Sequence, residues 1–202
     1  MNKKTLILTE LSVLTALILL MAFTPLGYIK TAGLEITLIT VPVIIGAVIL
    51  GEKAGAFLGL VFGITSFLQA VMGTSPFGVA MLTINPVYCF IVAVPTRVLM
   101  GYLTGLIYKP MKKKIRIPGN YIAGLFGALC NTVLFMTALM ICFRNADLIR
   151  NLETQLGTSN VFTFVIAFVG FNGLVEAIGS TILSGTVCTA LQSAHKNIKT
   201  SE

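Results

Sequence analysis

Charged residues are scarce in this chain of 202 residues, since only 10% are Asp, Glu, Lys or Arg and 56% are hydrophobic. Soluble domains usually contain about 25% charged residues, so this composition excludes a soluble protein and predicts an integral membrane protein. The mean hydropathy of +0.95 favours the same class. Little chain is left for a soluble part, and we expect a single membrane domain over residues 1–202.

The motifs of common enzymes are missing as well. No GxxxxGK[ST] loop occurs, so we expect no Walker-type ATP hydrolysis, and the stretch 51–55 resembles such a loop only superficially. With His195 as the single histidine, neither HExxH nor a Ser/His/Asp set is available. The cysteines form no CxxC pair and are interpreted as small buried apolar residues; they are Cys89, Cys130, Cys142 and Cys188. We therefore predict no enzyme, no catalytic residue, no metal site and no cofactor.

Six apolar runs divide the chain, and each is interpreted as a helix in a lipid bilayer. A helix needs about 20 apolar residues to span the membrane. The second run is short and contains Pro42, so we expect it to kink or to cross incompletely. The six runs cover about residues 5–24, 36–50, 54–72, 85–108, 121–143 and 161–191.

Basic residues predict how these six helices are oriented. Ten Lys and Arg residues lie on the side of the two termini and three lie in the loops of the other side. By the positive-inside rule both termini are cytoplasmic, and the loops around 25–36, 73–86 and 144–160 face outward. The net charge of +7 therefore reflects topology, and no nucleic-acid partner is expected.

Four polar side chains at membrane depth form the candidate site. Arg97 lies near the middle of the fourth run, where a charge facing lipid costs at least about 2.5–3.5 kcal/mol, so it must face protein, water or a ligand. Asn131 lies near the centre of the fifth run. Asn172 and Glu176 are four residues apart and share one helix face. Together they predict a substrate path; the alternative is an Arg97–Glu176 ion pair, capped by the asparagines, that binds nothing.

The chemistry of these groups favours a small organic anion. Arg97 presents a planar fork of donors that suits a carboxylate, and the two asparagines can bind amides and hydroxyls. Because Glu176 would repel an anion, we expect it to act with Asn172 on a hydroxyl or to orient Arg97.

Loop and rim residues are weaker candidates. Tyr88 is predicted to cover Arg97 from the outer side, and Asn85, Tyr28 and Phe77 are further candidates. For the loop residues, ordinary turn or interface packing explains the residue types equally well.

Several stretches resemble the substrate-binding S components of energy-coupling factor (ECF) vitamin transporters. These stretches are Thr24-Pro25-Leu26-Gly27-Tyr28-Ile29, residues 39–51, Lys53-Ala54-Gly55-Ala56-Phe57-Leu58-Gly59 and Pro95-Thr96-Arg97-Val98-Leu99-Met100-Gly101. The resemblance extends over about residues 8–190 and is strongest to pantothenate-specific members. Pantothenate is itself a carboxylate with an amide and two hydroxyls.

The resemblance implies a mechanism and partners. Such a component binds its vitamin from outside, under a lid formed by the loop between the first two spans and neighbouring loops. It docks on a transmembrane scaffold subunit coupled to two cytoplasmic ATPases, topples in the bacterial plasma membrane and releases the vitamin inside. In the family an Ala-xxx-Ala pair on the first span contacts the scaffold, and Ser12 and Ala16 occupy the matching positions.

Two alternatives remain open at this point. The first is an S component for another vitamin, such as folate, cobalamin or a pyridoxine-like compound. The second is a structural membrane protein whose buried polar groups pair only with one another.

Overall fold

Eight helices and one short hairpin follow one another in the computed structural model, which describes residues 3–24, 28–30, 35–158 and 160–200. They are α1 (Lys3–Ala22), β1 (Tyr28–Lys30), β2 (Glu35–Thr37), α2 (Thr40–Ile49), α3 (Glu52–Val71), α4 (Pro76–Ile84), α5 (Pro86–Lys114), α6 (Arg116–Phe143), α7 (Asp147–Leu156) and α8 (Val161–Thr200). The two strands pair antiparallel, with Ile29 opposite Ile36.

Five of the helices are long and apolar enough to cross a membrane, namely α1, α3, α5, α6 and α8. They confirm the expectation of a helical, multi-pass membrane protein. The ten residues of α2 rise only about 15 Å, which is half of the roughly 30 Å hydrocarbon core. The predicted count of six transmembrane helices is therefore not confirmed, and the second apolar run, which was expected to kink or to cross incompletely, forms only a short helix after β2.

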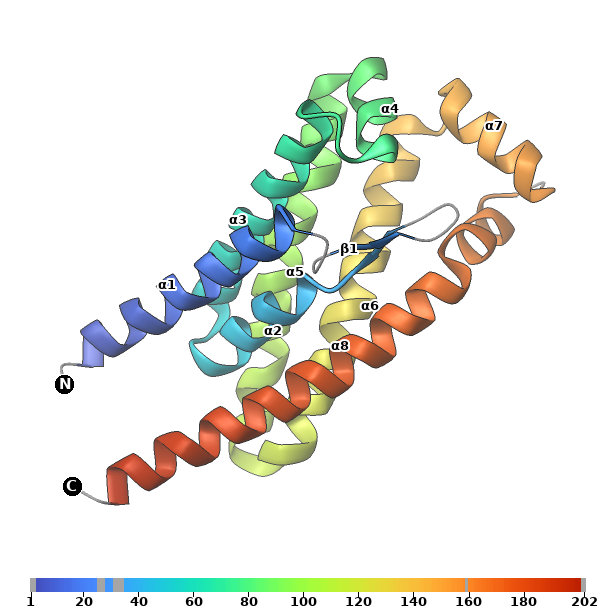
Figure 1. Cartoon of the computed structure of the whole chain (residues 1–202). Coiled ribbons are helices and arrows are strands. Elements are labelled where there is room, and N and C mark those ends of the chain that lie inside the picture. The colour runs from blue at the N-terminus through green and yellow to red at the C-terminus, as the bar shows by residue number, and fades with distance from the viewer. Residues whose placement is uncertain (1–2, 25–27, 31–34, 159, 201–202) are drawn as a thin grey trace.

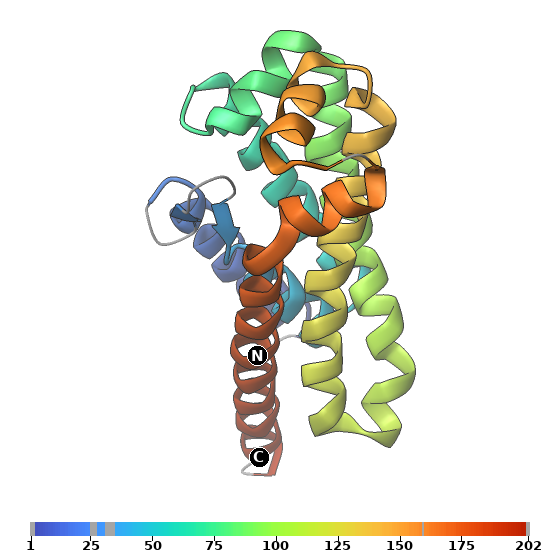
Figure 2. The same cartoon turned by 90° about the vertical axis from the view of Figure 1, so that its right-hand side faces the viewer.

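The helices nevertheless alternate in direction along the chain. Figure 1 shows both chain ends at the lower left, while α4 and α7 lie together at the opposite end, an arrangement that Figure 2 shows from the side. We call these the termini end and the α4/α7 end. Because α2 still runs back toward the termini end, the order of turns matches the order expected from the sequence.

Local sequence signals explain where the elements at the α4/α7 end begin. Pro76 and Pro86 stand at the first position of α4 and α5, where a missing N–H costs nothing. Ser75 caps α4 through its side chain, and Asn85 Oδ1 accepts hydrogen bonds from the two amides at the start of α5. The uncharged loop at 73–78 is thus partly a helix start.

Glycines bring α3 and α5 into backbone contact. A Cβ added at Gly59 would lie 2.8 Å from the carbonyl carbon of Arg97, and one added at Gly63 would lie 2.7 Å from Val94 Cα. Gly55 and Gly101 face each other in the same way. Small residues permit this close approach in lipid, so the small-residue face of α3 packs the bundle and holds the Arg97 segment in place.

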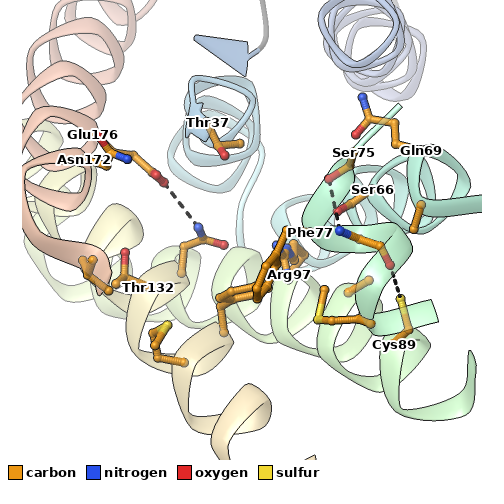
Figure 3. Close-up of a pocket in the computed structure, with 18 of the residues that line it drawn as sticks. Thr37, Ser66, Gln69, Ser75, Phe77, Cys89, Arg97, Thr132, Asn172 and Glu176 are labelled. Atoms are coloured by element: carbon orange, nitrogen blue, oxygen red, sulfur yellow. Dashed lines mark hydrogen bonds between the residues drawn. The ribbon is translucent and has the colours of Figure 1, made fainter. Parts of the chain in front are cut away.

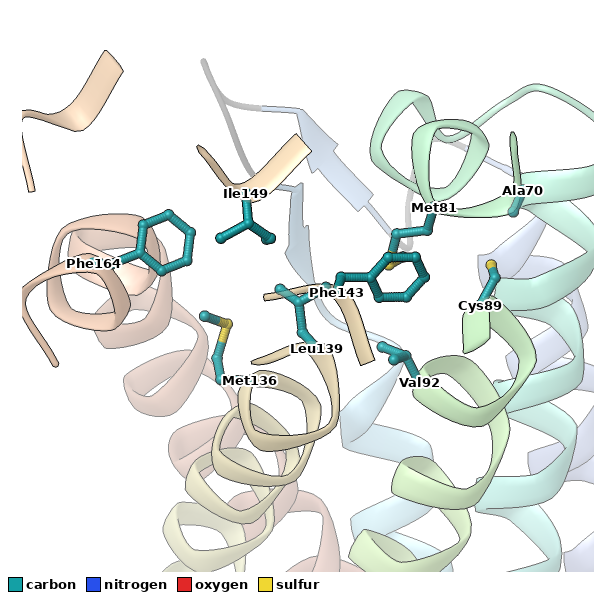
Figure 4. Close-up of a cluster of buried hydrophobic side chains, with 9 residues drawn as sticks. All are labelled: Ala70, Met81, Cys89, Val92, Met136, Leu139, Phe143, Ile149 and Phe164. Carbon is teal, nitrogen blue, oxygen red and sulfur yellow. The ribbon is translucent and has the colours of Figure 1, made fainter. Parts of the chain in front are cut away.

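An apolar cluster closes the α4/α7 end (Figure 4). Its buried members come from α3 through α8, and they are Ala70, Met81, Cys89, Val92, Met136, Leu139, Phe143, Ile149 and Phe164. Ile149 is contributed by α7, a helix that the sequence-based expectation of an irregular loop at 144–160 missed. Its polar composition concealed an amphipathic helix that needs only one buried side chain.

A polar network joins α5, α6 and α8 near the termini end. Gln192 Nε2 donates to Tyr108 Oη at 2.9 Å and to Asn120 Oδ1 at 3.1 Å. Arg116 Nε donates to Gln192 Oε1 at 2.8 Å, and Asn120 Nδ2 donates to Thr189 Oγ1 at 2.9 Å. These bonds satisfy buried polar groups that would otherwise be costly to place in a membrane protein.

Helix α1 is the least buried of the long helices. Its C-terminal half packs on α2 and α3 through Ile18 and Ala22, both of which are buried. Ser12 and Ala16 are exposed on the outside of the same helix. The small-residue pair is therefore not used for packing within the described part of the chain.

Candidate functional site

A cavity of about 370 Å³ lies between α3, α4, α5, α6, α8 and β2 (Figure 3). Its volume falls within the range of small-molecule sites, about 300–1,000 Å³. Five predicted residues line it, from four different helices: Phe77, Arg97, Asn131, Asn172 and Glu176. The sequence-based expectation that the four buried polar groups converge therefore agrees with the geometry.

Arg97 faces the inside of the bundle and is only 8% exposed. Its Nη1 donates to the carbonyl oxygen of Val92 at 2.7 Å and to Thr96 Oγ1 at 3.0 Å. The guanidinium carbon lies 4.6 Å from the ring centroid of Phe135 and 5.4 Å from that of Phe62. Stacked cations of this kind are attracted to the ring face, so the guanidinium is held at the cavity wall in a defined plane.

Asn131 and Glu176 form the opposite side of the polar lining. Asn131 Nδ2 donates to Glu176 Oε1 at 3.3 Å, and the backbone amide of Thr37 also donates to the Glu176 carboxylate. Figure 3 shows Arg97 and Glu176 approaching the cavity from different sides. Through Thr37, Glu176 therefore connects α8 to the hairpin that leads into α2.

The Asn131 side chain leaves one polar atom for a ligand. Asn131 is 7% exposed, and its Oδ1 has no hydrogen-bond partner within the described parts of the chain. Buried acceptors are rarely left without a donor. Because one N–H of Nδ2 is used by Glu176 and Oδ1 has no partner there, the amide offers its oxygen as an acceptor, besides the second N–H, to whatever occupies the cavity.

Aromatic rings close the cavity toward the α4/α7 end. The Phe77 ring on α4 lies 6.4 Å from Phe135 on α6 and 5.5 Å from Phe168 on α8, measured between centroids. The cavity therefore has an apolar aromatic side next to its polar side, as sites for small organic molecules usually do.

Three of the predicted residues lie elsewhere. Tyr88 is 42% exposed and packs edge-to-face on Phe143, so it does not cover Arg97. Asn85 uses its side chain to cap α5. The Tyr28 backbone belongs to β1, and its side chain lies outside the described residues.

Sequence reasoning missed several polar residues of the cavity, among them Ser66, Gln69, Ser75 and Thr132. Gln69 is 8% exposed, and its Nε2 donates to the carbonyl oxygen of Ala22 at the end of α1. The sequence did carry a signal for two of these lining residues, because Ser66 and Gln69 are three residues apart and share one face of an otherwise apolar helix.

The arrangement is suited to binding a small organic molecule. It combines a cation, a buried amide acceptor, hydroxyls and aromatic faces around one cavity. Among the described residues, no three His, Cys, Asp or Glu side chains gather as metal ligands. A small molecule with an anionic group and hydrogen-bond donors would fit this set.

Comparison with known proteins agrees with this description. A family model described as "ECF transporter, substrate-specific component" matches residues 6–187. The pantothenic acid transporter PanT of Lactococcus lactis subsp. cremoris is 35% identical over 170 residues, which cover 80% of each chain. The pantothenate transporter PanT of Leuconostoc mesenteroides subsp. mesenteroides is 31% identical over 199 residues, which cover 94% of each chain. This multi-pass membrane protein therefore belongs to the family of substrate-specific components of ECF transporters.

Proposed function

We propose that this chain binds pantothenate in the cavity and that Arg97 holds its carboxylate. One observation supports this proposal most directly: a buried guanidinium, packed over the ring of Phe135, lines a cavity of suitable size. An arginine fork binds a carboxylate through two parallel hydrogen bonds. The names of the two relatives support the same substrate.

Asn131 supports the remaining part of the substrate assignment. Its buried Oδ1 needs a donor, and pantothenate carries an amide N–H and two hydroxyls. Glu176 holds the Asn131 amide in this orientation and need not touch the anionic end. A purely structural protein offers Asn131 Oδ1 no donor from the described parts of the chain, whereas a bound ligand would supply one.

The proposed orientation places the cavity toward the outside of the bacterial plasma membrane. The cavity is lined by the start of α4, and the α4/α7 end is opposite the two termini (Figure 1). The basic residues concentrate near the termini end, so both termini are assigned to the cytoplasm. Six crossings are proposed, with α2 as a partial one.

Transport would require partners, because binding alone releases nothing inside the cell. We propose that the exposed face of α1 docks on a transmembrane scaffold subunit that works with two cytoplasmic ATPases. Ser12 and Ala16 are exposed small residues, and small residues permit close helix contact in lipid. Ala16→Trp should therefore prevent copurification with the scaffold while pantothenate binding is retained. Val133→Trp, at an exposed position of α6, is the matched control and should copurify normally.

The substrate proposal is tested by equilibrium binding of labelled pantothenate to the purified protein in lipid nanodiscs. Arg97→Ala should weaken binding about 10- to 100-fold, the usual effect of losing a charged hydrogen bond. The matched control is Arg150→Ala, because Arg150 is exposed on α7 and should not affect affinity. Size-exclusion profiles establish that both variants remain folded.

The outcomes separate the alternatives. Unchanged affinity of Arg97→Ala would remove the role of Arg97. Tight binding of folate, cobalamin or a pyridoxine-like compound, but not of pantothenate, would change the substrate. Mass spectrometry of small molecules that copurify with the protein identifies the ligand independently.

A further inference from the structure

Gln69 connects the cavity to α1. The residue lines the cavity, and its Nε2 donates to the carbonyl oxygen of Ala22, the last residue of α1. Figure 3 shows the Gln69 carboxamide at the edge of the cavity, next to the pale blue-violet ribbon of α1. One side chain therefore contacts both the binding site and the helix proposed to dock.

The hydrogen bond from Gln69 satisfies the carbonyl oxygen of Ala22, which has no donor within α1 itself. The last four carbonyl groups of an α-helix lack intrahelical donors, and unsatisfied backbone groups are costly inside a membrane. Ala22 is only 3% exposed, so solvent cannot easily supply the donor.

The other contacts of α1 define its orientation relative to α3 less sharply. Its buried side chain Ile18 packs with Leu58 and Phe62 of α3, with Leu11 and Leu14 partly buried against the same cluster. Apolar contacts of this kind are non-directional. A hydrogen bond depends steeply on angle, so Gln69 restrains the orientation of the last turn more sharply than the apolar cluster does.

We propose that Gln69 is a positioning residue that couples occupancy of the cavity to the orientation of α1. This inference rests on the proposed function. The donor to Ala22 and the acceptor Oε1 belong to one planar carboxamide, so a ligand hydroxyl or amide that bonds to Oε1 also restrains the donor. Hydrogen bonds in such a chain polarise and strengthen one another.

Reciprocity makes the proposal quantitative. If pantothenate raises the affinity of the chain for the scaffold by some factor, then the scaffold must raise the affinity for pantothenate by the same factor. We expect a factor of at least about five, the lower end of typical coupling. Gln69→Leu should reduce this factor to about one, because leucine neither donates to Ala22 nor bonds to the ligand.

The experiment measures binding of the nanodisc-embedded chain to the purified scaffold–ATPase module, with and without saturating pantothenate. The readout is the ratio of the two affinities, which a general loss of stability would not change. Gln69→Glu is the second variant, since it keeps the side-chain length but replaces the donor with an oxygen. In both variants the affinity for the scaffold–ATPase module should no longer depend on pantothenate.

The matched control is Gln192→Leu. Gln192 is a similarly buried glutamine in the polar network of the termini end, where its side chain bonds to residues of α5 and α6, and it does not line the cavity. The Gln192→Leu protein should have lower thermal stability but the same ratio of scaffold affinities with and without pantothenate as the wild-type chain. Hydrogen exchange offers a check without the module: pantothenate should slow exchange at the end of α1 in the wild-type chain and not in Gln69→Leu.

Failure of the coupling is distinguishable from failure of the proposed function. If the wild-type chain binds no pantothenate, the proposed function itself is wrong. If it binds pantothenate and Gln69→Leu and Gln69→Glu keep the full ratio and the slowed exchange, then Gln69 does not couple the two sites and this inference is overturned.

Discussion

Asn131 of α6 donates a hydrogen bond through Nδ2 to Glu176 Oε1 of α8 at 3.3 Å. The contact decides which end of the Asn131 amide faces the cavity. Its Oδ1 is buried and has no partner among the described residues. Glu176, which accepts in turn from the Thr37 amide, thereby holds the Asn131 amide in this orientation.

Replacement of Asn131 by leucine should weaken pantothenate binding about tenfold or more. Leucine has a similar size but cannot accept a hydrogen bond, so a ligand donor would be buried without a partner, at about 1–3 kcal/mol. Isothermal titration calorimetry of the protein in nanodiscs measures the loss. An affinity within about twofold of wild type would show that Oδ1 accepts nothing from the ligand.

Asn120 offers a matched control on the same helix. It is also a buried asparagine of α6, but its partners are Gln192 and Thr189 at the termini end. Asn120→Leu should lower the melting temperature and leave pantothenate affinity unchanged. A loss of affinity in Asn131→Leu, together with a loss of stability alone in Asn120→Leu, would distinguish a binding residue from a structural one.

Substitution of Gly59 by alanine should impair both stability and binding. The added Cβ would overlap the backbone of Arg97 on α5, so α3 and α5 must separate. Overpacking of this kind costs about 1–3 kcal/mol, and it displaces the guanidinium from the cavity wall. Thermal unfolding and pantothenate titration measure the two effects.

Gly179→Ala is the control for this change. A Cβ at Gly179 would meet its nearest neighbour, Leu38 Cδ2, at 3.9 Å, which is ordinary contact. Alanine is also the better helix former, by about 1 kcal/mol. We expect unchanged or slightly higher stability, and equal damage by both substitutions would contradict the role assigned to the α3–α5 contact.

Loss of Gln192 should destabilise the protein without affecting the site. Gln192→Leu leaves the buried side chains of Tyr108 and Asn120 each without one partner, and each unsatisfied buried group costs about 1–3 kcal/mol. The melting temperature should fall, and pantothenate affinity should stay within about twofold of wild type once the variant is folded. The neighbouring exposed Ser193→Ala should change neither quantity. A large loss of affinity in a folded Gln192→Leu protein would connect this network to the cavity.

Much of the site could be predicted from the sequence because charge in a membrane span is expensive. That cost alone required Arg97 to face inward, and the spacing of Asn172 and Glu176 placed both on one face of α8. Spans of similar length put Asn131 at a comparable depth. The family could be recognised from the chain as well, and the comparisons confirm it.

Other residues were placed wrongly or were missed. Tyr88 lies nine residues, or about two and a half helical turns, before Arg97, so the inward position of Arg97 already places Tyr88 on the outward face of α5, where it is exposed. Asn85 could have been interpreted as a helix cap, since Pro86 follows it. The helix α7 depends on a single buried residue, Ile149.

The sequence by itself determined a helical membrane protein of a recognisable family, with a positive charge that had to be buried. Only the tertiary structure decided that Asn131 Oδ1 is left as an acceptor without a partner among the described residues. It also decided that Gln69 joins the cavity to α1. The physical reason is that composition and spacing set the depth and the cost of a polar group. Which partner the polar group finds depends on how helices that are distant in sequence rotate and approach one another. The glycines of α3, for example, allow α3 and α5 to come into backbone contact.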